Sequence, residues 1–98
     1  QVAGLRYTWN PDAAPGSRIV KVEVEGESGW APIDPDATYG VVTNNFMRKG
    51  GDGYALFRDN GQNAYDFGPN LEDVVIAYLQ ENAPYTPGVL GVISEGTE

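Results

Sequence analysis

The segment "GLRYTWNPDAAPGSRIVKVEVEG", residues 4–26, decides the fold of this chain. Its first six and last nine residues alternate apolar and polar side chains, a period that is typical of strands with one buried face. The eight residues between them contain two prolines and a glycine, which favour a loop. We therefore predict an antiparallel pair of strands. The valines of the second strand should lie on one side, with Lys21, Glu23 and Glu25 in water on the other.

A third strand is predicted from "YGVVTNNF", residues 39–46. Its apolar side chains fall on both faces, which is typical of a strand in the middle of a sheet. The stretch before it, residues 27–38, contains two prolines and alternating acids, and we predict a connector there. The stretch after it, residues 47–68, is predicted to be mostly irregular, with one helical turn near residues 55–58.

The clearest helix signal is "NLEDVVIAYLQENAP", residues 70–84. Apolar side chains recur there at helical spacing, Asn70 suits the N-cap position, and Pro84 ends the helix. A final short strand is predicted from "GVLGVIS", residues 88–94. Together these elements predict an α+β fold, a mostly antiparallel sheet with at least one packed helix.

Size and charge narrow the class of partner. The chain has 98 residues, 41% of them apolar, which suits one globular domain. Six basic residues stand against fourteen acidic ones, so a nucleic-acid polymer is not an expected partner, whereas one small nucleotide stays open. No apolar run reaches the length of a membrane span, and no signal peptide is recognisable. Because the chain opens with Gln and not Met, we expect it to be a piece of a longer protein.

The chain has no cysteine and no histidine. Without cysteine there is no disulfide and no thiolate chemistry, and the cellular compartment is not defined. Histidine is the usual base near neutral pH and the commonest metal ligand, so we expect neither a metal site nor a catalytic residue in this chain. Any hydrolytic chemistry of the parent protein is expected to lie outside these residues.

One glycine-rich stretch, "NNFMRKGGDGY" at residues 44–54, has two interpretations. It lacks the Gly-Lys-Ser/Thr ending of a phosphate loop, and Leu56 stands where a dinucleotide fingerprint needs its third glycine. In the simpler interpretation the stretch is a flexible turn after a strand, with Phe46 in the core. In the functional interpretation it is a binding loop. Arg48 and Lys49 are expected in solvent, where they could steer an anion.

The functional interpretation has a definite chemistry. Gly50, Gly51 and Gly53 allow positive φ and a close approach of the backbone to a ligand. Asp52, held between them, offers two acceptor oxygens to a vicinal diol such as the 2′,3′ pair of a ribose. The ring of Phe46 suits stacking on a base, a contact worth about 1–3 kcal/mol. A diol reader and a base platform six residues apart predict a nucleoside site.

In order and spacing, "GLRYTWNPDAAPGSRIVKVEV", "PIDPDATYGVVTNNF" and "GGDGY" resemble the C-terminal domain of bacterial and animal 5′-nucleotidases. The similarity covers nearly the whole chain, so residues 1–98 are identified as the distal part of one such substrate-binding domain. The resemblance implies that Phe46 is the family's base-stacking Phe and Asp52 its ribose-binding Asp. One departure lies at residues 91–93, where relatives often carry "GR" before Ile or Val and this chain has "GVI".

The resemblance further implies a parent hydrolase. Its catalytic part would be an N-terminal metallophosphoesterase domain with two divalent metal ions, absent from this chain, so the chain alone is expected to be non-catalytic. Its ligand would be a nucleoside or nucleotide of unspecified base, and its location extracellular, cell-surface or periplasmic. Part of a domain leaves apolar surface bare, so a homodimer of the fragment is a further possibility.

Two other interpretations stay open from the sequence. One is a stand-alone binding or adaptor module with no enzymatic partner. The other is part of a hydrolase that acts on 2′,3′-cyclic nucleotides or on nucleotide sugars. Sister thiosulfohydrolases resemble this chain less, because they tend to lack the pairing of a Phe with "GGDGY".

Overall fold

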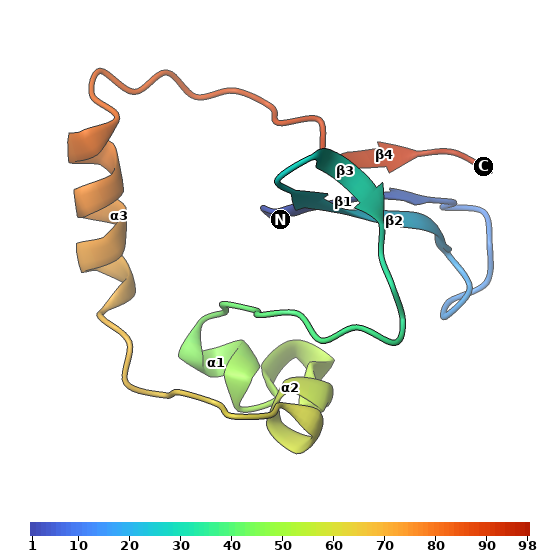
Figure 1. The fold of residues 1–98 in the computed structure, drawn as a ribbon, viewed down its shortest axis with the longest axis horizontal. Coiled ribbons are helices and arrows are strands. Elements are labelled where there is room, and N and C mark those ends of the chain that lie inside the picture. The colour runs from blue at the N-terminus through green and yellow to red at the C-terminus, as the bar shows by residue number, and fades with distance from the viewer. The chain divides into compact units, whose positions relative to one another are not determined.

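The computed structural model describes all 98 residues, which divide into two compact units. The first, here called the sheet unit, comprises Gln1–Thr38 and Gly88–Glu98, and the second, the helical unit, comprises Tyr39–Pro87. Figure 1 shows the strands of the sheet unit gathered into one sheet, whereas the helical unit contains helices and no strand. The predicted α+β fold is confirmed.

The sheet has the strand order β3-β2-β1-β4. Its strands are β1 (Leu5–Trp9), β2 (Ile19–Gly26), β3 (Gly29–Pro32) and β4 (Ile93–Glu95). β2 pairs antiparallel with both β1 and β3, and β4 pairs parallel with β1. The predicted antiparallel pair is therefore confirmed, the sheet is mostly antiparallel, and the final strand is shorter than predicted.

The register sorts side chains onto two faces of the sheet. Arg6 lies opposite Glu23 and Thr8 opposite Lys21, whereas the next pair along, Tyr7 and Val22, points to the other face. One face is therefore polar and the other apolar. β1 is the best protected strand, because it has a neighbour on both sides and all five of its residues are half-buried.

The predicted connector at residues 27–38 is wrong in its first half. Gly26 and Gly29 lie opposite each other across a two-residue turn, and Gly29 has a φ of 107°, which glycine adopts without a Cβ clash. This turn sends the chain back along β2 as β3, in which Trp30 pairs with Glu25. The rest of the segment is irregular, as predicted.

The predicted third strand at residues 39–46 is also wrong. The segment is irregular up to Asn44, and α1 (Asn45–Arg48) begins inside it. Valine and threonine favour extended backbone, but a strand needs a hydrogen-bonded neighbour, and no strand pairs with this segment. Asn44 instead caps α1, because its side-chain oxygen accepts a hydrogen bond of 2.9 Å from the N–H of Met47.

The helical unit continues with a 3-10 turn, η1 (Gly51–Gly53), and with α2 (Ala55–Asn60) and α3 (Leu71–Glu81). α2 contains the predicted helical turn, and α3 confirms the predicted helix. Asn70 lies at the N-cap position of α3 with extended backbone, but its side chain makes no capping hydrogen bond there. No helix of the chain combines the length and the hydropathy that crossing a membrane requires.

Candidate functional site

The glycine-rich stretch is a tight turn that joins α1 to α2 (Figure 1). Two backbone hydrogen bonds close it: the N–H of Gly50 donates to the carbonyl of Met47 at 3.0 Å, and the N–H of Tyr54 donates to that of Gly51 at 3.1 Å. α1 and α2 also contact each other. In the structure the stretch is therefore a turn closed by backbone hydrogen bonds.

The turn uses left-handed backbone at three of its four central positions. Gly50, Asp52 and Gly53 have φ values of 97°, 55° and 81°. The two glycines adopt such values freely, and aspartate tolerates the left-handed region better than most residues. As a result the chain doubles back on itself and leaves Asp52 exposed at the tip.

Gly51 has a different role, because its backbone lies against the ring of Phe46. A Cβ at position 51 would lie 2.6–2.7 Å from three ring carbons of Phe46, so any larger residue would force the ring or the loop to shift. Phe46 is 57% exposed and not in a core, so most of its ring remains open to solvent. The fold thus brings the ring against the residue that directly precedes Asp52. That Phe46, Asp52 and the three glycines bind a ligand stays a prediction.

Arg48, predicted to be in solvent, instead bridges three segments of the helical unit. Its Nη1 donates a 2.9 Å hydrogen bond to the carbonyl of Phe57 in α2. Its Nε lies 3.1 Å from Oδ1 of Asp66, within ion-pair distance but without hydrogen-bond alignment. The Arg48 side chain is only 28% exposed. Sequence reasoning missed this bridge because its partners are nine and eighteen residues away in segments without periodicity.

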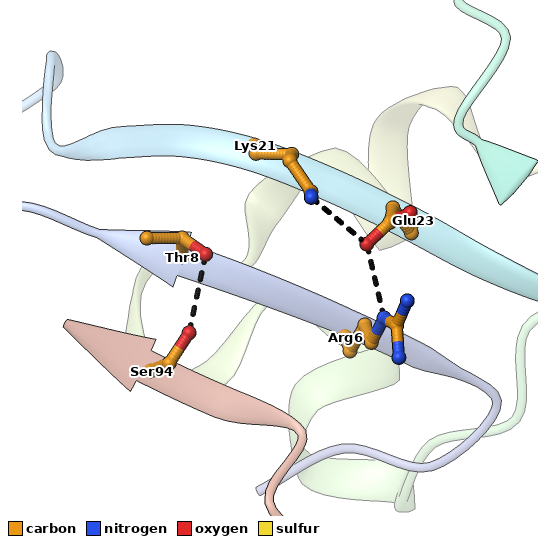
Figure 2. Close-up of polar contacts among 5 residues, drawn as sticks. All are labelled: Arg6, Thr8, Lys21, Glu23 and Ser94. Atoms are coloured by element: carbon orange, nitrogen blue, oxygen red, sulfur yellow. Dashed lines mark hydrogen bonds and ion pairs between the residues drawn. The ribbon is translucent and has the colours of Figure 1, made fainter. Parts of the chain in front are cut away.

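The polar face of the sheet carries the other ordered cluster of charges. Figure 2 shows Arg6 and Lys21 converging on one carboxylate oxygen of Glu23, at 3.0 and 3.3 Å, and Thr8 beside Ser94 at 3.1 Å. Glu23 is 15% exposed, so the prediction that it lies in water is wrong. The hydrogen bond from Arg6 is the main cause that lowers the pKa of the Glu23 carboxyl, with Lys21 adding to it and desolvation opposing it.

A cavity of about 230 Å³ opens beside this cluster, between β1, β2 and the chain that enters β4. On the same part of the sheet the guanidinium of Arg6 lies 4.6 Å from the ring centroid of Trp30, a cation–π distance. The charged side chains that line the cavity pair with one another. They are therefore explained as a network that stabilises the sheet.

Neither location offers a metal site. The chain holds no group of three or more His, Cys, Asp or Glu side chains that could bind an ion together. The resemblance assigns the two divalent ions to a domain outside these residues, so no step that involves them can be derived from this chain.

Fold and loop together define an α+β module in which a turn rich in glycine carries an exposed ring packed against Gly51 and an exposed carboxylate at the next residue. The model of the family described as 5′-nucleotidase, C-terminal domain, matches residues 1–59, more than half of the chain. The chain belongs to this family.

Individual relatives support the assignment. The chain is 34% identical over 97 residues to an apyrase of Tabanus yao and 45% identical over 60 residues to the trifunctional nucleotide phosphoesterase protein YfkN of Bacillus subtilis. These alignments cover 95% and 60% of this chain but 17% and 4% of the two relatives. The solved structure of a 5′-nucleotidase precursor from Thermus thermophilus matches all of this chain and 19% of its own, with a TM-score of 0.92 and 39% identity. The chain thus spans less than a fifth of each of these proteins.

Proposed function

We propose that this chain is the distal part of the nucleoside-binding domain of a 5′-nucleotidase-like phosphohydrolase. In this proposal Phe46 stacks on the base, Asp52 accepts hydrogen bonds from the ribose hydroxyls, and Gly50, Gly51 and Gly53 shape the loop. The phosphate chemistry belongs to a dimetal domain outside these residues, so the chain binds and orients the ligand without hydrolysing it. The parent acts in nucleotide catabolism outside the cytoplasm, at an extracellular, cell-surface or periplasmic location.

The contact between the ring of Phe46 and the backbone of Gly51 supports the proposal most directly. A ring held on one side by glycine and open on the other is oriented before a base arrives, so little side-chain freedom is lost on stacking. Asp52 follows at once in the chain and is exposed, so its carboxylate is free to accept hydrogen bonds from two neighbouring hydroxyls.

The test compares two substrates in the full-length gene product. Phe46→Ala should raise KM for AMP about 5- to 150-fold, because a lost base stack costs about 1–3 kcal/mol. Asp52→Asn keeps the size and the left-handed tolerance of the residue but replaces one acceptor oxygen by a donor, and it should also raise KM for AMP. Hydrolysis of p-nitrophenyl phosphate, which has neither base nor ribose, should be unchanged in both variants.

Phe67→Ala is the matched control, because Phe67 is an exposed aromatic of the same unit outside the loop. Equal losses on AMP and on p-nitrophenyl phosphate in the Phe46 and Asp52 variants would contradict the assignment. A full-length product that binds adenosine but hydrolyses no phosphate ester would instead identify the chain as part of a stand-alone binding module.

The class of phosphate ester needs a separate measurement. One relative is named an apyrase and another a trifunctional nucleotide phosphoesterase. These names indicate that members of the family hydrolyse more than one class of phosphate ester. A panel of AMP, ATP, 2′,3′-cyclic AMP and a nucleotide sugar separates the mononucleotide proposal from a cyclic-nucleotide or nucleotide-sugar hydrolase. The loop itself would serve each of them, since it addresses the base and the ribose and not the phosphate.

A further inference from the structure

We propose that Arg48 is a positioning residue that holds the Phe46–Asp52 loop in its binding geometry, an inference that rests on the proposed function. Arg48 touches neither Phe46 nor Asp52 in any hydrogen bond or ion pair. It acts through the two groups that its guanidinium contacts, the Phe57 carbonyl in α2 and the Asp66 carboxylate.

The position of Arg48 on α1 suits this role. Residues two apart on a helix point to different sides, so Phe46 and Arg48 lie on different sides of the single turn that is α1. Phe46 packs against Gly51 on one side, and Arg48 reaches Phe57 and Asp66 on the other. A helix of four residues has too few internal hydrogen bonds to be rigid, so these two anchors fix its orientation.

The carbonyl of Phe57 is available to Arg48 for a local reason. Phe57 lies within the last four residues of α2, whose carbonyls have no partner inside the helix. Gly61 follows α2, and a Cβ there would lie 2.7 Å from the Phe57 oxygen. Glycine at position 61 therefore leaves this oxygen accessible, and the charged donor of Arg48 satisfies it.

The two contacts of Arg48, with the Phe57 carbonyl and with Asp66, form what we call the Arg48 clamp, which spans the loop. Arg48 lies just before Gly50 and Phe57 lies just after Tyr54, so their hydrogen bond ties together the two ends of the turn that carries Asp52. Asp66 adds a third anchor through its ion pair at 3.1 Å. When the clamp is lost, α1 and α2 separate more easily, and the ring and the carboxylate no longer share one fixed geometry.

The test uses Arg48→Met in the full-length gene product, with Lys49→Met as the matched control. Lys49 is an exposed cation one residue away, so its loss removes the same charge without the clamp. Arg48→Met should raise KM for AMP about tenfold, equivalent to about 1.4 kcal/mol, with kcat and p-nitrophenyl phosphate hydrolysis unchanged. Arg48→Lys keeps the charge but replaces the guanidinium fork by a compact ammonium that cannot reach both partners at once. Its KM for AMP should therefore lie between those of the unchanged protein and Arg48→Met.

A second readout needs no substrate. The N–H groups of Gly50 and Tyr54 close the loop, so their hydrogen exchange should accelerate in Arg48→Met and stay unchanged in Lys49→Met. Equal exchange in Arg48→Met and the unchanged protein would overturn the inference. The same holds if Arg48→Met leaves KM for AMP unchanged while Phe46→Ala raises it. If Phe46→Ala itself has no selective effect on AMP, the proposed function fails, and the exchange measurement still decides the structural role of Arg48.

Discussion

Replacing Gly51 by alanine tests the contact on which the candidate site depends. The added methyl group would lie 2.6–2.7 Å from three carbons of the Phe46 ring. Carbon atoms in ordinary contact are about 3.5–4.0 Å apart, so the ring or the loop must move by about 1 Å. Gly51 does not have a positive φ, so the backbone itself accepts alanine and the clash is the only source of strain. Overpacking in a core costs about 1–3 kcal/mol, and because the Phe46 ring is 57% exposed and can turn toward solvent, we expect a cost of about 1 kcal/mol.

The assay is a double-mutant cycle between positions 51 and 46, read by chemical denaturation of the full-length gene product. Gly51→Ala alone should lower the free energy of unfolding by about 1 kcal/mol. In a Phe46→Ala background the methyl group has space, so the same change should cost less than about 0.5 kcal/mol. Gly40→Ala is the control, since nothing lies within 4 Å of a Cβ there and its φ is not positive.

Ligand binding gives the second arm of the same prediction. A ring displaced by about 1 Å no longer lies where a base is stacked, and misplacements of that size are large enough to cost up to about 100-fold in rate. Gly51→Ala should therefore raise KM for AMP in addition to lowering the free energy of unfolding. If Gly51→Ala costs equally much with and without Phe46, the ring does not rest on this glycine, and the reasoning about a prearranged base platform is refuted.

Two further predictions concern local stability. Because the hydrogen bond from Arg6, aided by Lys21, holds the pKa of Glu23 below its value in the unfolded chain, the stability it contributes is present above the unfolded pKa and is lost as pH falls through the folded one. Denaturation between pH 7 and pH 3 should show this acid loss, and Glu23→Gln should make the profile flatter; an identical slope in the variant would refute the role of the network. Asn44→Ala removes the cap of α1 and should cost about 1 kcal/mol with a rise in KM for AMP, whereas Asn70→Ala should have little effect, since Asn70 makes no capping hydrogen bond. Equal costs at the two positions would contradict the assignment of Asn44 as the cap.

Local periodicity accounts for what the sequence could predict of the fold. The alternation in β1 and β2 and the helical spacing in α3 each lie within one continuous segment, and each was predicted correctly. β3 was missed because it has four residues, one of them a proline, and is recognisable only from its pairing with β2. The segment at residues 39–46 shows the opposite error, since strand propensity alone does not supply the neighbour that a strand requires.

The charged residues show where reading one segment at a time fails. Read from its own strand alone, Glu23 is expected in solvent, because the alternation places it on the face away from the valines of β2. Its environment is set by Arg6 across the pair and by Lys21 two residues away on the same face. Arg48 is likewise expected in solvent when its own stretch is read alone, yet its partner Asp66 lies in irregular chain eighteen residues away. Cross-strand register and contacts between irregular segments leave no periodic trace in a sequence.

The candidate site is different, because nearly everything that shapes it lies within eleven consecutive residues. The Asn44 cap, the Phe46–Gly51 contact and the three left-handed residues of the turn need no distant partner. The glycines, the ring and the acid could therefore suggest the site before any fold was known. The contribution of the fold is the Arg48 clamp, which reaches outside this stretch to fix the orientation of α1. A local turn can therefore specify which groups would meet the proposed ligand, whereas how rigidly they are held depends on contacts made farther along the chain. For this reason Phe46→Ala and Arg48→Met should both raise KM for AMP, and Arg48→Met should also accelerate exchange at the N–H groups of Gly50 and Tyr54.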